Sequence, residues 1–363
     1  MPARPILKDI AKKTRLSLSA VSLALRKPDA LPPATVARVR RAADALGYTP
    51  DPALSALAAY RSRQRVRQSF SVIALVSDWP KRNDWFHRPS AQKLWEGASA
   101  RATALGYSLQ HLWAREDNAS PHRFSQILVN RGIRGVILAP FEHPEARFDL
   151  AWENFAVVTI ERPAHYTTFH HVVPSYYADM LRVWQELRVR GYQRIGLSID
   201  GHLAHRVAHQ WEAAHNFEQA RIGANLDAVP TLIGRSVDPP SRVLEWVQRH
   251  RPDAIISRSD HGYQTLRAAG VRIPAEIGYV SLNVIDDAPG VSGILQPRDV
   301  MGAAAVDALN ALLLVGHRGP GASSLGTHVD GVWHEGRTVR PAASDGARAV
   351  SMRTPERITS PSQ

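Results

Sequence analysis

The chain has 363 residues and a formal net charge of +12, with 45 Lys or Arg against 33 Asp or Glu. Hydrophobic residues make up 44% and charged residues 21%, a globular composition that excludes the disordered, collagenous and coiled-coil classes. There are no cysteines, so disulfide scaffolds, cysteine nucleophiles, iron–sulfur clusters and thiolate zinc sites are excluded as well.

The N-terminal sequence is basic but lacks the unbroken apolar stretch of a signal peptide. No window of the chain approaches the roughly 18 apolar residues that a membrane-spanning helix needs. We therefore expect a cytoplasmic protein with no membrane partner.

Positive charge is concentrated in the first 67 residues, which carry 14 Lys or Arg, four Asp and no Glu. The rest of the chain carries 31 basic and 29 acidic residues, so it is nearly neutral. A small basic module joined to a near-neutral body is the footprint of nucleic-acid binding, and a solvated basic tail is the alternative.

Apolar spacing in this basic segment predicts one helix over residues 6–13 and a second over residues 18–25. The hydroxyl of Ser17 can cap the second helix by accepting hydrogen bonds from its first-turn amides. Val21 and Leu25 lie four residues apart and face the first helix. Two short helices that cross this closely have helix-turn-helix spacing. The apolar face of the first helix consists of Ile6, Ile10 and Ala11.

A third helix is predicted from Pro33, which suits a first turn, to Leu46. Gly47 follows it, where a left-handed C-terminal cap usually lies. The polar side of this helix offers three cations to phosphates: Arg38, Arg40 and Arg41.

These residues closely resemble the headpiece of lac-repressor-type (LacI/GalR) transcription factors, from residue 6 to about residue 60. The resemblance rests on Lys8-Asp9-Ile10-Ala11, Leu16-Ser17, Ala20-Val21-Ser22, Thr35, Arg38-Val39 and Leu46-Gly47-Tyr48-Thr49-Pro50-Asp51. It implies a helix-turn-helix headpiece at residues 1–49 whose second helix enters the DNA major groove, followed by a hinge helix and basic linker at residues 50–69.

The resemblance also implies which residues contact DNA. Base-reading positions fall on Leu18, Ser19 and Leu23. Expected contacts to the DNA backbone fall on Ser17, Ala20, Ser22 and Arg26. Further expected DNA contacts are Thr35, Arg38 and Tyr48. Leu18 and Leu23 can sense thymine methyl groups but donate no hydrogen bond, and their alternative role is packing inside the headpiece. In the hinge, Leu57 would wedge between central base pairs and Leu54 would contact the second hinge helix.

Two residues depart from the family pattern. Arg15 stands at a turn position where the family often has Gly or Asn, so we expect a left-handed backbone there at a cost of about 1 kcal/mol. Pro32 replaces a Ser cap before the third helix and loses one capping hydrogen bond.

From residue 70 onward, β-rich runs alternate with amphipathic helical runs, which predicts an α/β fold with an open parallel sheet. Strands are predicted at residues 72–76, 136–139, 157–160, 195–199, 254–257 and 279–282. Helices are predicted at residues 91–105, 177–190 and 299–315. The last of these carries apolar residues that form either a dimer face or a sheet contact: Ala303, Val306, Leu309, Leu313 and Leu314. The similar endings Leu105-Gly106-Tyr107 and Arg190-Gly191-Tyr192 are a weak repeat signal.

The resemblance to LacI-type regulators continues here and implies two Rossmann-like lobes, like those of periplasmic sugar-binding proteins, over residues 70–340. We expect residues 341–363 to be disordered. Ligands of such folds bind between the lobes, where the carboxyl ends of strands converge. The residues expected there include aromatic side chains, which stack on sugar rings, and Arg, Asp and Asn, which hydrogen-bond hydroxyls, so they favour a sugar-like or nucleoside-like effector. The expected effector contacts, each of which has an ordinary structural role as its alternative, are Asp78, Trp85, Phe86, Arg206, Ser259, Asp260, Asn283 and Gln296.

The combined prediction is a homodimeric transcriptional regulator, most often a repressor in this family, that binds double-stranded DNA at a pseudopalindromic operator of about 14 to 20 base pairs. Effector-independent regulation and an exported sugar-binding protein are the alternatives. No enzyme motif such as G-x-S-x-G, a phosphate loop or H-E-x-x-H is present, and no cofactor is expected. His202, His205 and His209 could share a helix face, but the sequence offers no further metal ligand.

Overall fold

The computed structural model describes residues 5–26, 31–48, 71–116, 120–142, 148–162, 168–222, 228–235, 238–258, 260–286 and 289–342. The chain divides into two compact units, Met1–Ser69 and Phe70–Gln363. We call the described residues of the first unit the headpiece and those of the second the body. None of the described helices is both long and apolar enough to cross a membrane.

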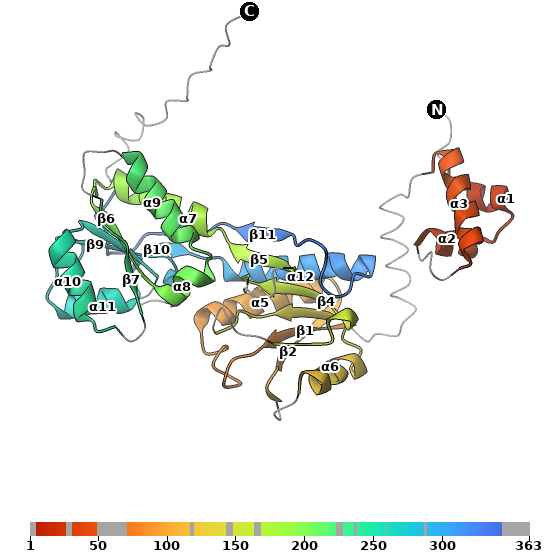
Figure 1. Ribbon diagram of the computed structural model, residues 1–363, viewed down its shortest axis with the longest axis horizontal. Coiled ribbons are helices and arrows are strands. Elements are labelled where there is room, and N and C mark those ends of the chain that lie inside the picture. The colour runs from red at the N-terminus through yellow and green to blue at the C-terminus, as the bar shows by residue number, and fades with distance from the viewer. Residues whose placement is uncertain are drawn as a thin grey trace, which may run out of the picture. The chain divides into compact units, whose positions relative to one another are not determined.

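The headpiece consists of α1 (Leu7–Thr14), α2 (Leu18–Arg26) and α3 (Pro33–Leu46), as predicted (Figure 1). Ser17 caps α2, because its Oγ accepts a hydrogen bond from the Ala20 amide at 3.2 Å. The helices enclose a small core of Ile10, Val21, Ala24, Val36, Val39, Ala42 and Ala43.

The backbone of the headpiece bears out two further predictions and corrects one. Arg15 is left-handed, with φ 51°, and so is Gly47, with φ 65°. Ile6 does not belong to the apolar face of α1, since the helix begins one residue later and Ile6 is exposed. Leu7 packs against the core instead.

The first lobe of the body is a parallel sheet in the order β11-β5-β4-β3-β1-β2. Its strands are β1 (Ser71–Ser77), β2 (Tyr107–Trp113), β3 (Gly135–Leu138), β4 (Ala156–Ile160), β5 (His170–Pro174) and β11 (Gly326–Val329). Its helices are α5 (Pro89–Ala104), α6 (Pro121–Asn130) and α12 (Arg298–Val315), with the short 3-10 helix Trp152–Asn154 before β4.

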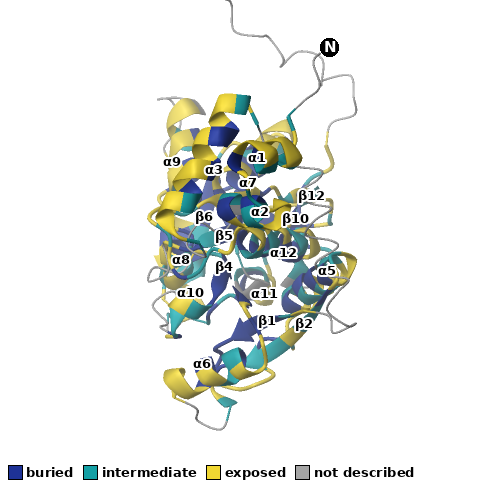
Figure 2. Cartoon of the chain, turned by 90° about the vertical axis from the view of Figure 1, so that its right-hand side faces the viewer, coloured by how far each residue is buried: buried dark blue, intermediate teal, exposed yellow. Residues whose placement is uncertain are grey.

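Both faces of this sheet are covered, which explains why β1 is apolar at consecutive positions. Ile73 and Leu75 pack on the side of α5 and α12, whereas Ala74 and Val76 pack on the side of α6. Figure 2 shows β1 and β4 buried in dark blue and the outer surfaces of α6, α9 and α10 largely exposed in yellow.

The second lobe repeats this architecture with the strand order β12-β10-β9-β8-β6-β7, in which only the β10–β12 pair is antiparallel. Its strands are β6 (Ile195–Asp200), β7 (Leu232–Gly234), β8 (Ala254–Ser257), β9 (Gly278–Ser281), β10 (Ser292–Leu295) and β12 (Val332–His334). Its helices are α7 (Tyr176–Val189), α8 (Gly201–Arg206), α9 (Gln210–Ile222), α10 (Ser241–His250) and α11 (Asp260–Ala268), with the 3-10 helix Val284–Asp286. Helices α7 and α9 cover one face, and α10 and α11 cover the other.

All six predicted strands and the three predicted body helices are present, with ends that differ by no more than two residues. In α12, Val306 and Leu309 are buried in the first lobe, so the sheet-packing alternative holds for them, whereas Leu314 is exposed. The similar endings at Gly106 and Gly191 reflect the same type of helix cap and do not mark equivalent helices of the two lobes. Gly106 and Gly191 both end helices with φ near 79°, but α5 lies between two strands of its sheet while α7 precedes the first strand of the other.

The chain passes between the lobes three times within the described residues, from β5 to α7, from β10 to α12 and from β11 to β12. Asp179 of α7 joins two of these crossings, because its Oδ1 accepts a hydrogen bond from the Gly331 amide at 2.8 Å. The side chain is 2% exposed, and burial raises its pKa to about 6 even though the bond from Gly331 acts to lower it.

We predict that Asp179→Asn flattens the pH dependence of stability between about pH 4 and pH 6. The folded wild type holds the Asp179 proton up to about pH 6. The unfolded chain releases it near pH 3.9, so wild-type stability falls by about 2 kcal/mol as pH rises through this window. Urea unfolding of both proteins at several pH values would measure the effect. The control is Asp307→Asn at an exposed position, which should keep the wild-type dependence of the free energy of unfolding on pH. If the Asp179 variant also keeps that dependence, the prediction is wrong.

Candidate functional site

The headpiece presents an apolar and hydroxyl-bearing surface on α2. Leu18 is 51% exposed and Leu23 is 36% exposed, so neither packs inside the headpiece. Ser17 and Ser19 are also exposed, with their hydroxyl oxygens 3.0 Å apart, whereas Ala20 and Ser22 are half-buried. The side chain of Arg26 lies outside the described part of the chain.

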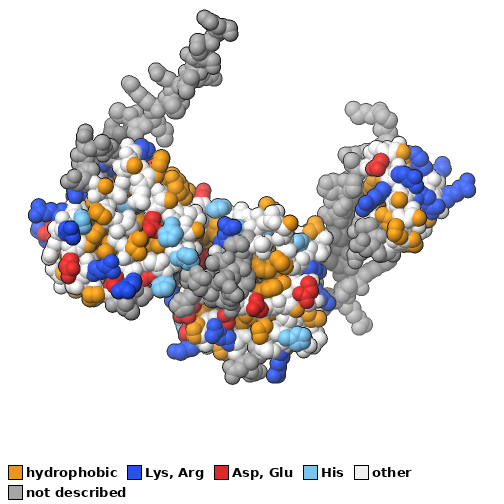
Figure 3. Space-filling model, in the orientation of Figure 1, with side chains coloured by type: hydrophobic (Ala, Val, Ile, Leu, Met, Phe, Trp, Pro, Cys, Tyr) orange, Lys and Arg blue, Asp and Glu red, His pale blue; other side chains and the backbone are white. Residues whose placement is uncertain are grey.

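Most of the exposed charged side chains of the headpiece are positive. Figure 3 shows Lys and Arg side chains over much of the visible face of the headpiece. Seven exposed cations stand against two exposed carboxylates, those of Asp9 and Asp44. The cations are Lys8, Lys12, Lys13, Arg15, Arg38, Arg40 and Arg41. A compact fold with this charge excludes the alternative of an unstructured basic tail, and it suits a polyanion.

The other predicted DNA contacts are half-buried or lie outside the described residues. Thr35 is half-buried in the first turn of α3. Tyr48 is half-buried and packs against the headpiece core, which leaves only part of its ring for DNA. Leu54 and Leu57 of the predicted hinge lie outside the described residues, as do residues 343–363 of the predicted tail.

A cavity of about 230 Å³ lies between the two lobes of the body. It is formed where strands end. Trp79 follows β1, Pro140 follows β3 and Glu161 follows β4 in the first lobe. Arg258 follows β8 and Gln296 follows β10 in the second lobe. The carboxyl ends of parallel strands are where α/β folds bind ligands.

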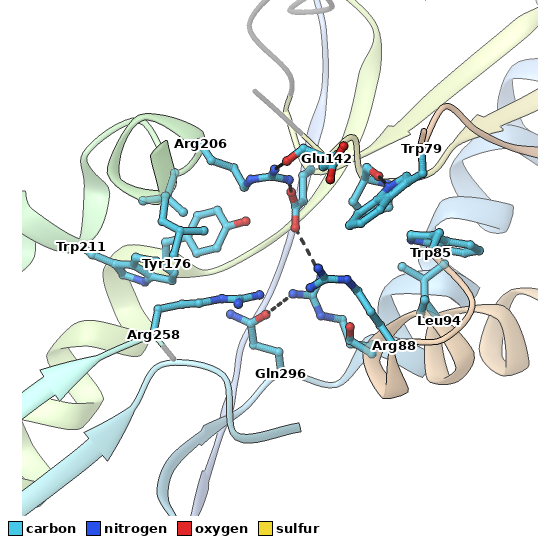
Figure 4. A pocket seen from close by; sticks show the side chains of 17 residues that line it. Trp79, Trp85, Arg88, Leu94, Glu142, Tyr176, Arg206, Trp211, Arg258 and Gln296 are labelled. Carbon is cyan, nitrogen blue, oxygen red and sulfur yellow. Dashed lines mark hydrogen bonds and ion pairs between the residues drawn. The ribbon is translucent and has the colours of Figure 1, made fainter. Parts of the chain in front are cut away.

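The remaining lining residues come mainly from the starts of helices. They are Trp85, Arg88, Ser90, Ala91, Leu94, Glu142, Tyr176, Leu203, Arg206, Val207, Trp211 and Arg298. In Figure 4, Trp79, Trp85 and Leu94 lie on one side of the cavity, and Arg206, Tyr176, Trp211 and Arg258 lie on the other.

Glu161 is the electrostatic centre of this cavity. Its backbone is left-handed, with φ 65°, an unfavourable conformation for a residue with a side chain and one that often marks functional sites. Its carboxylate lies 3.0 Å from Arg206 Nη1 and 3.6 Å from Arg298 Nη1. Burial by itself would raise the pKa of Glu161, but the guanidinium groups of Arg206 and Arg298 outweigh burial and lower it below its ordinary value.

Arg206 connects the two lobes directly. It belongs to α8 of the second lobe and donates to the carbonyl oxygens of Phe141, at 2.7 Å, and Glu142 in the first lobe. Together with Glu161, these contacts satisfy most of its guanidinium group. Arg206 therefore holds the lobes in the present arrangement as well as lining the cavity.

Aromatic side chains form the other walls. Trp79 donates from Nε1 to the Pro140 carbonyl at 2.8 Å, and the guanidinium of Arg88 lies 4.8 Å from the centre of its ring. Trp211 meets Tyr176 edge to face, with ring centres 5.3 Å apart. Burial, reinforced by the charge of Glu161, raises the pKa of Tyr176, so this phenol is a neutral donor at physiological pH. Such walls suit the faces and hydroxyls of a ring-shaped ligand.

Of the predicted effector contacts, Trp85, Arg206 and Gln296 line the cavity, and Asp78, Phe86 and Asn283 do not. Arg115 donates from Nε to Asp78 Oδ1 at 2.7 Å, and neither residue lines the cavity. Phe86 packs edge to face on its neighbour Trp85, and Asn283 is fully buried. Asp260 begins α11, but its side chain lies outside the described residues, as does all of Ser259.

Sequence reasoning missed several lining residues: Trp79, Arg88, Glu161, Tyr176, Trp211, Arg258 and Arg298. The rule that ligands bind at strand ends would have found Trp79, Glu161 and Arg258, which follow strands β1, β4 and β8. Tyr176 also lies two residues after β5, so the same rule indicates it. Arg88, Trp211 and Arg298 lie at the starts of helices.

The predicted histidine group does not form a metal site. His209 lies beyond the end of α8, in a turn where its φ is 57°, so it does not share a helix with the other two histidines. Across the described residues, no three His, Cys, Asp or Glu side chains come together as metal ligands would.

A basic helix-turn-helix module joined to a two-lobed body with a ligand-sized cavity defines the class of DNA-binding transcriptional regulators. Residues 6–51 match the sequence model described as "Bacterial regulatory proteins, lacI family". The headpiece therefore matches the lacI family of bacterial regulatory proteins, as its sequence predicted, and the relatives of this chain are regulators and not enzymes.

One such relative is the HTH-type transcriptional repressor CytR of Escherichia coli (strain K12). It is 23% identical over 317 residues, which cover 83% of this chain and 87% of CytR. Among solved structures, a transcriptional regulator CelR–cellobiose complex matches with a TM-score of 0.57 and 18% identity, over 92% of this chain and all of CelR. The lac repressor dimer bound to operator and the anti-inducer ONPF matches with a TM-score of 0.54 and 15% identity, over 93% of this chain and all of the repressor chain. At these identities, the structural matches define the fold.

Proposed function

We propose that this protein is a homodimeric repressor that binds a pseudopalindromic operator. Its affinity for the operator falls or rises when a small effector, a sugar or sugar derivative, occupies the interlobe cavity. The observation that carries the proposal is the exposure of Leu18, Ser19 and Leu23 on α2 of a headpiece whose exposed charges are mostly positive. Large exposed leucines on so small a module require a partner surface, and thymine methyl groups in a major groove supply one.

Dimerisation follows from the size of the headpiece. One helix-turn-helix module buries too little surface for tight specific binding, so two copies on adjacent half-sites are required. The lac repressor structure that this chain resembles is a dimer on its operator. We propose that Leu57 from each copy inserts between central base pairs and that Leu54 joins the two hinge helices.

The cavity supports control by a ligand because it is built from both lobes. A ligand that contacts both walls changes how closely the lobes approach, and therefore the spacing of the two hinges and headpieces. Such a change is a coupling between two distinct sites.

We predict that Arg38→Ala weakens binding to operator and random DNA by the same factor. Arg38 is exposed on α3, where it can contact a phosphate but no base edge. Losing one phosphate contact reduces the slope of log K against log salt by about 0.9 for each bound headpiece. Fluorescence anisotropy titrations over a salt series would measure this. Arg249→Ala, which removes an exposed arginine from the body, is the matched control, and equal slopes in both variants would remove Arg38 from the interface.

The experiment that tests the function is selection of bound sites from a random DNA pool by the full-length protein at near-physiological salt. An enriched palindrome with a flexible central step is the expected result. If a folded dimer enriches no sequence, with or without a pool of metabolites, the operator-binding proposal is wrong.

A second candidate is regulation without an effector, and one specific observation favours it. Arg206 already bridges the cavity to Glu161 and to two carbonyl oxygens, as a ligand would. Under this alternative, no metabolite changes the affinity for the selected operator. Under the main proposal, at least one metabolite changes it, and Arg206→Ala reduces that change.

A further inference from the structure

The interlobe cavity has an excess of positive charge. Its lining includes four arginines and two glutamates, a formal excess of two positive charges. The arginines are Arg88, Arg206, Arg258 and Arg298, and they come from both lobes. A neutral sugar needs no such excess, and confining four guanidinium groups in a half-buried space costs free energy unless anions compensate them.

Glu161 compensates only part of this charge. It pairs with Arg206 and Arg298, and Arg206 also donates hydrogen bonds to two backbone carbonyl oxygens. Arg88 lies against Trp79 and forms no ion pair with a carboxylate among the described residues. In Figure 4 the side chain of Arg258 extends from the opposite wall toward Gln296 and the middle of the cavity.

Two buried donors in the lining have no hydrogen-bond acceptor. Arg298 is 7% exposed, and its Nε is unpartnered although Nη2 donates to Gln296 Oε1 at 2.5 Å. Nε1 of buried Trp211 is also unpartnered. A buried donor without an acceptor costs about 1–3 kcal/mol, and that cost is higher for a charged group. Acceptor atoms of a ligand in the cavity are one way to satisfy both nitrogens.

Helix ends add to the positive potential. Helices α7 and α12 begin at the cavity-lining residues Tyr176 and Arg298, and Ser90 in the first turn of α5 also lines the cavity. The N-terminus of a long helix carries about half a positive charge and favours bound anions.

We propose that the effector is an anion of monosaccharide size, whose phosphate or carboxylate group is bound by Arg88, Arg258 and Arg298 while Trp79 and Trp85 pack against its ring. This inference rests on the proposed function and names the ligand class of the same site. The size follows from the cavity volume of about 230 Å³, which is below the roughly 300–1,000 Å³ of sites for drug-sized ligands.

The test separates a bacterial metabolite extract by anion exchange into an acidic and a neutral fraction and measures the thermal unfolding midpoint of the full-length protein with each. We expect the acidic fraction to raise the midpoint by about 5 °C or more once its active component reaches about 100 times its Kd. The neutral fraction should have no effect. Phosphatase treatment of the acidic fraction then distinguishes the two sources of the anion, because it abolishes the shift for a phosphate and preserves it for a carboxylate.

The variant arm compares two double substitutions with equal loss of charge. Arg88→Gln with Arg258→Gln removes one cavity arginine from each lobe, and we expect it to lose at least nine-tenths of the shift. Arg82→Gln with Arg249→Gln removes one exposed arginine from each lobe outside the cavity lining and should keep the shift. An equal shift in the two double variants would place the anion elsewhere and overturn the proposal.

The fractions also distinguish this inference from the proposed function. If the neutral fraction shifts the midpoint and changes operator affinity, effector control stands and the anionic ligand is wrong. If neither fraction shifts the midpoint, the anionic ligand is wrong and the second candidate, regulation without an effector, is favoured. Operator selection is run with and without the pool of metabolites, so its result does not depend on which fraction shifts the midpoint.

Discussion

Glu161→Gln is expected to destabilise the body by about 3 kcal/mol, because it leaves two guanidinium groups in the cavity without their carboxylate. The Glu161 side chain is 12% exposed and lies between Arg206 and Arg298, so solvent screens these interactions only weakly. Removing one partner of a buried ion pair costs about 3–5 kcal/mol, and the Gln carbonyl recovers part of this by accepting one hydrogen bond. The variant keeps a side chain of the same shape, so the loss is electrostatic.

Urea unfolding followed by tryptophan fluorescence would measure this loss, since all nine tryptophans lie in the body. Glu96→Gln is the matched control, because Glu96 pairs with Lys93 on the exposed surface of α5 and such pairs contribute 1 kcal/mol or less. Equal midpoints for the two variants would show that Glu161 is not the counterion of the cavity.

The same variant has a predicted pH signature. The folded pKa of Glu161 is lowered, so its stabilisation is fully present above the unfolded value of about 4.3 and is lost as pH falls through the folded value. The difference between wild type and Glu161→Gln should therefore be constant near neutral pH and shrink below about pH 4. A difference that grows on acidification would contradict the assigned ion pairs.

The headpiece was the most predictable part of this molecule because its signals are local. The cap at Ser17, the left-handed residues Arg15 and Gly47, and the spacing of Val21 and Leu25 each depend on neighbours a few positions away. Six of the twelve described strands of the body were predictable for a related reason. β1, for example, is covered on both faces, so it is a continuous apolar run.

The cavity was only partly predictable because its chemistry depends on contacts between distant residues. Asp78 follows β1, where a ligand contact is expected, but Arg115 binds it from 37 positions away. Glu161 enters the cavity on a left-handed backbone, which no sequence pattern indicates for a glutamate. Gln296 was predicted because it follows a strand, but Arg298 gains its role from the crossing between β10 and α12, which only the folded topology defines.

The headpiece is much smaller than the body, so we expect its free energy of unfolding to be much smaller as well. At about 0.05–0.15 kcal/mol per residue, the three helices of the headpiece have only a few kcal/mol of stability in total. Ile10 is completely buried at the centre of their core. Replacing a buried Ile by Ala costs about 2–5 kcal/mol, which is comparable to that total.

Ile10→Ala is therefore expected to unfold the headpiece, abolish specific DNA binding and leave the body intact. Anisotropy titration with the selected operator should show at least a hundredfold loss of affinity. Tryptophan fluorescence of the body should keep its wild-type urea midpoint. Ile6→Ala makes the same substitution four residues earlier at a 52% exposed position and should bind DNA like wild type. If Ile10→Ala also binds DNA like wild type, the described headpiece core does not support DNA binding. If Ile10→Ala lowers the urea midpoint of the body, the two units do not fold independently.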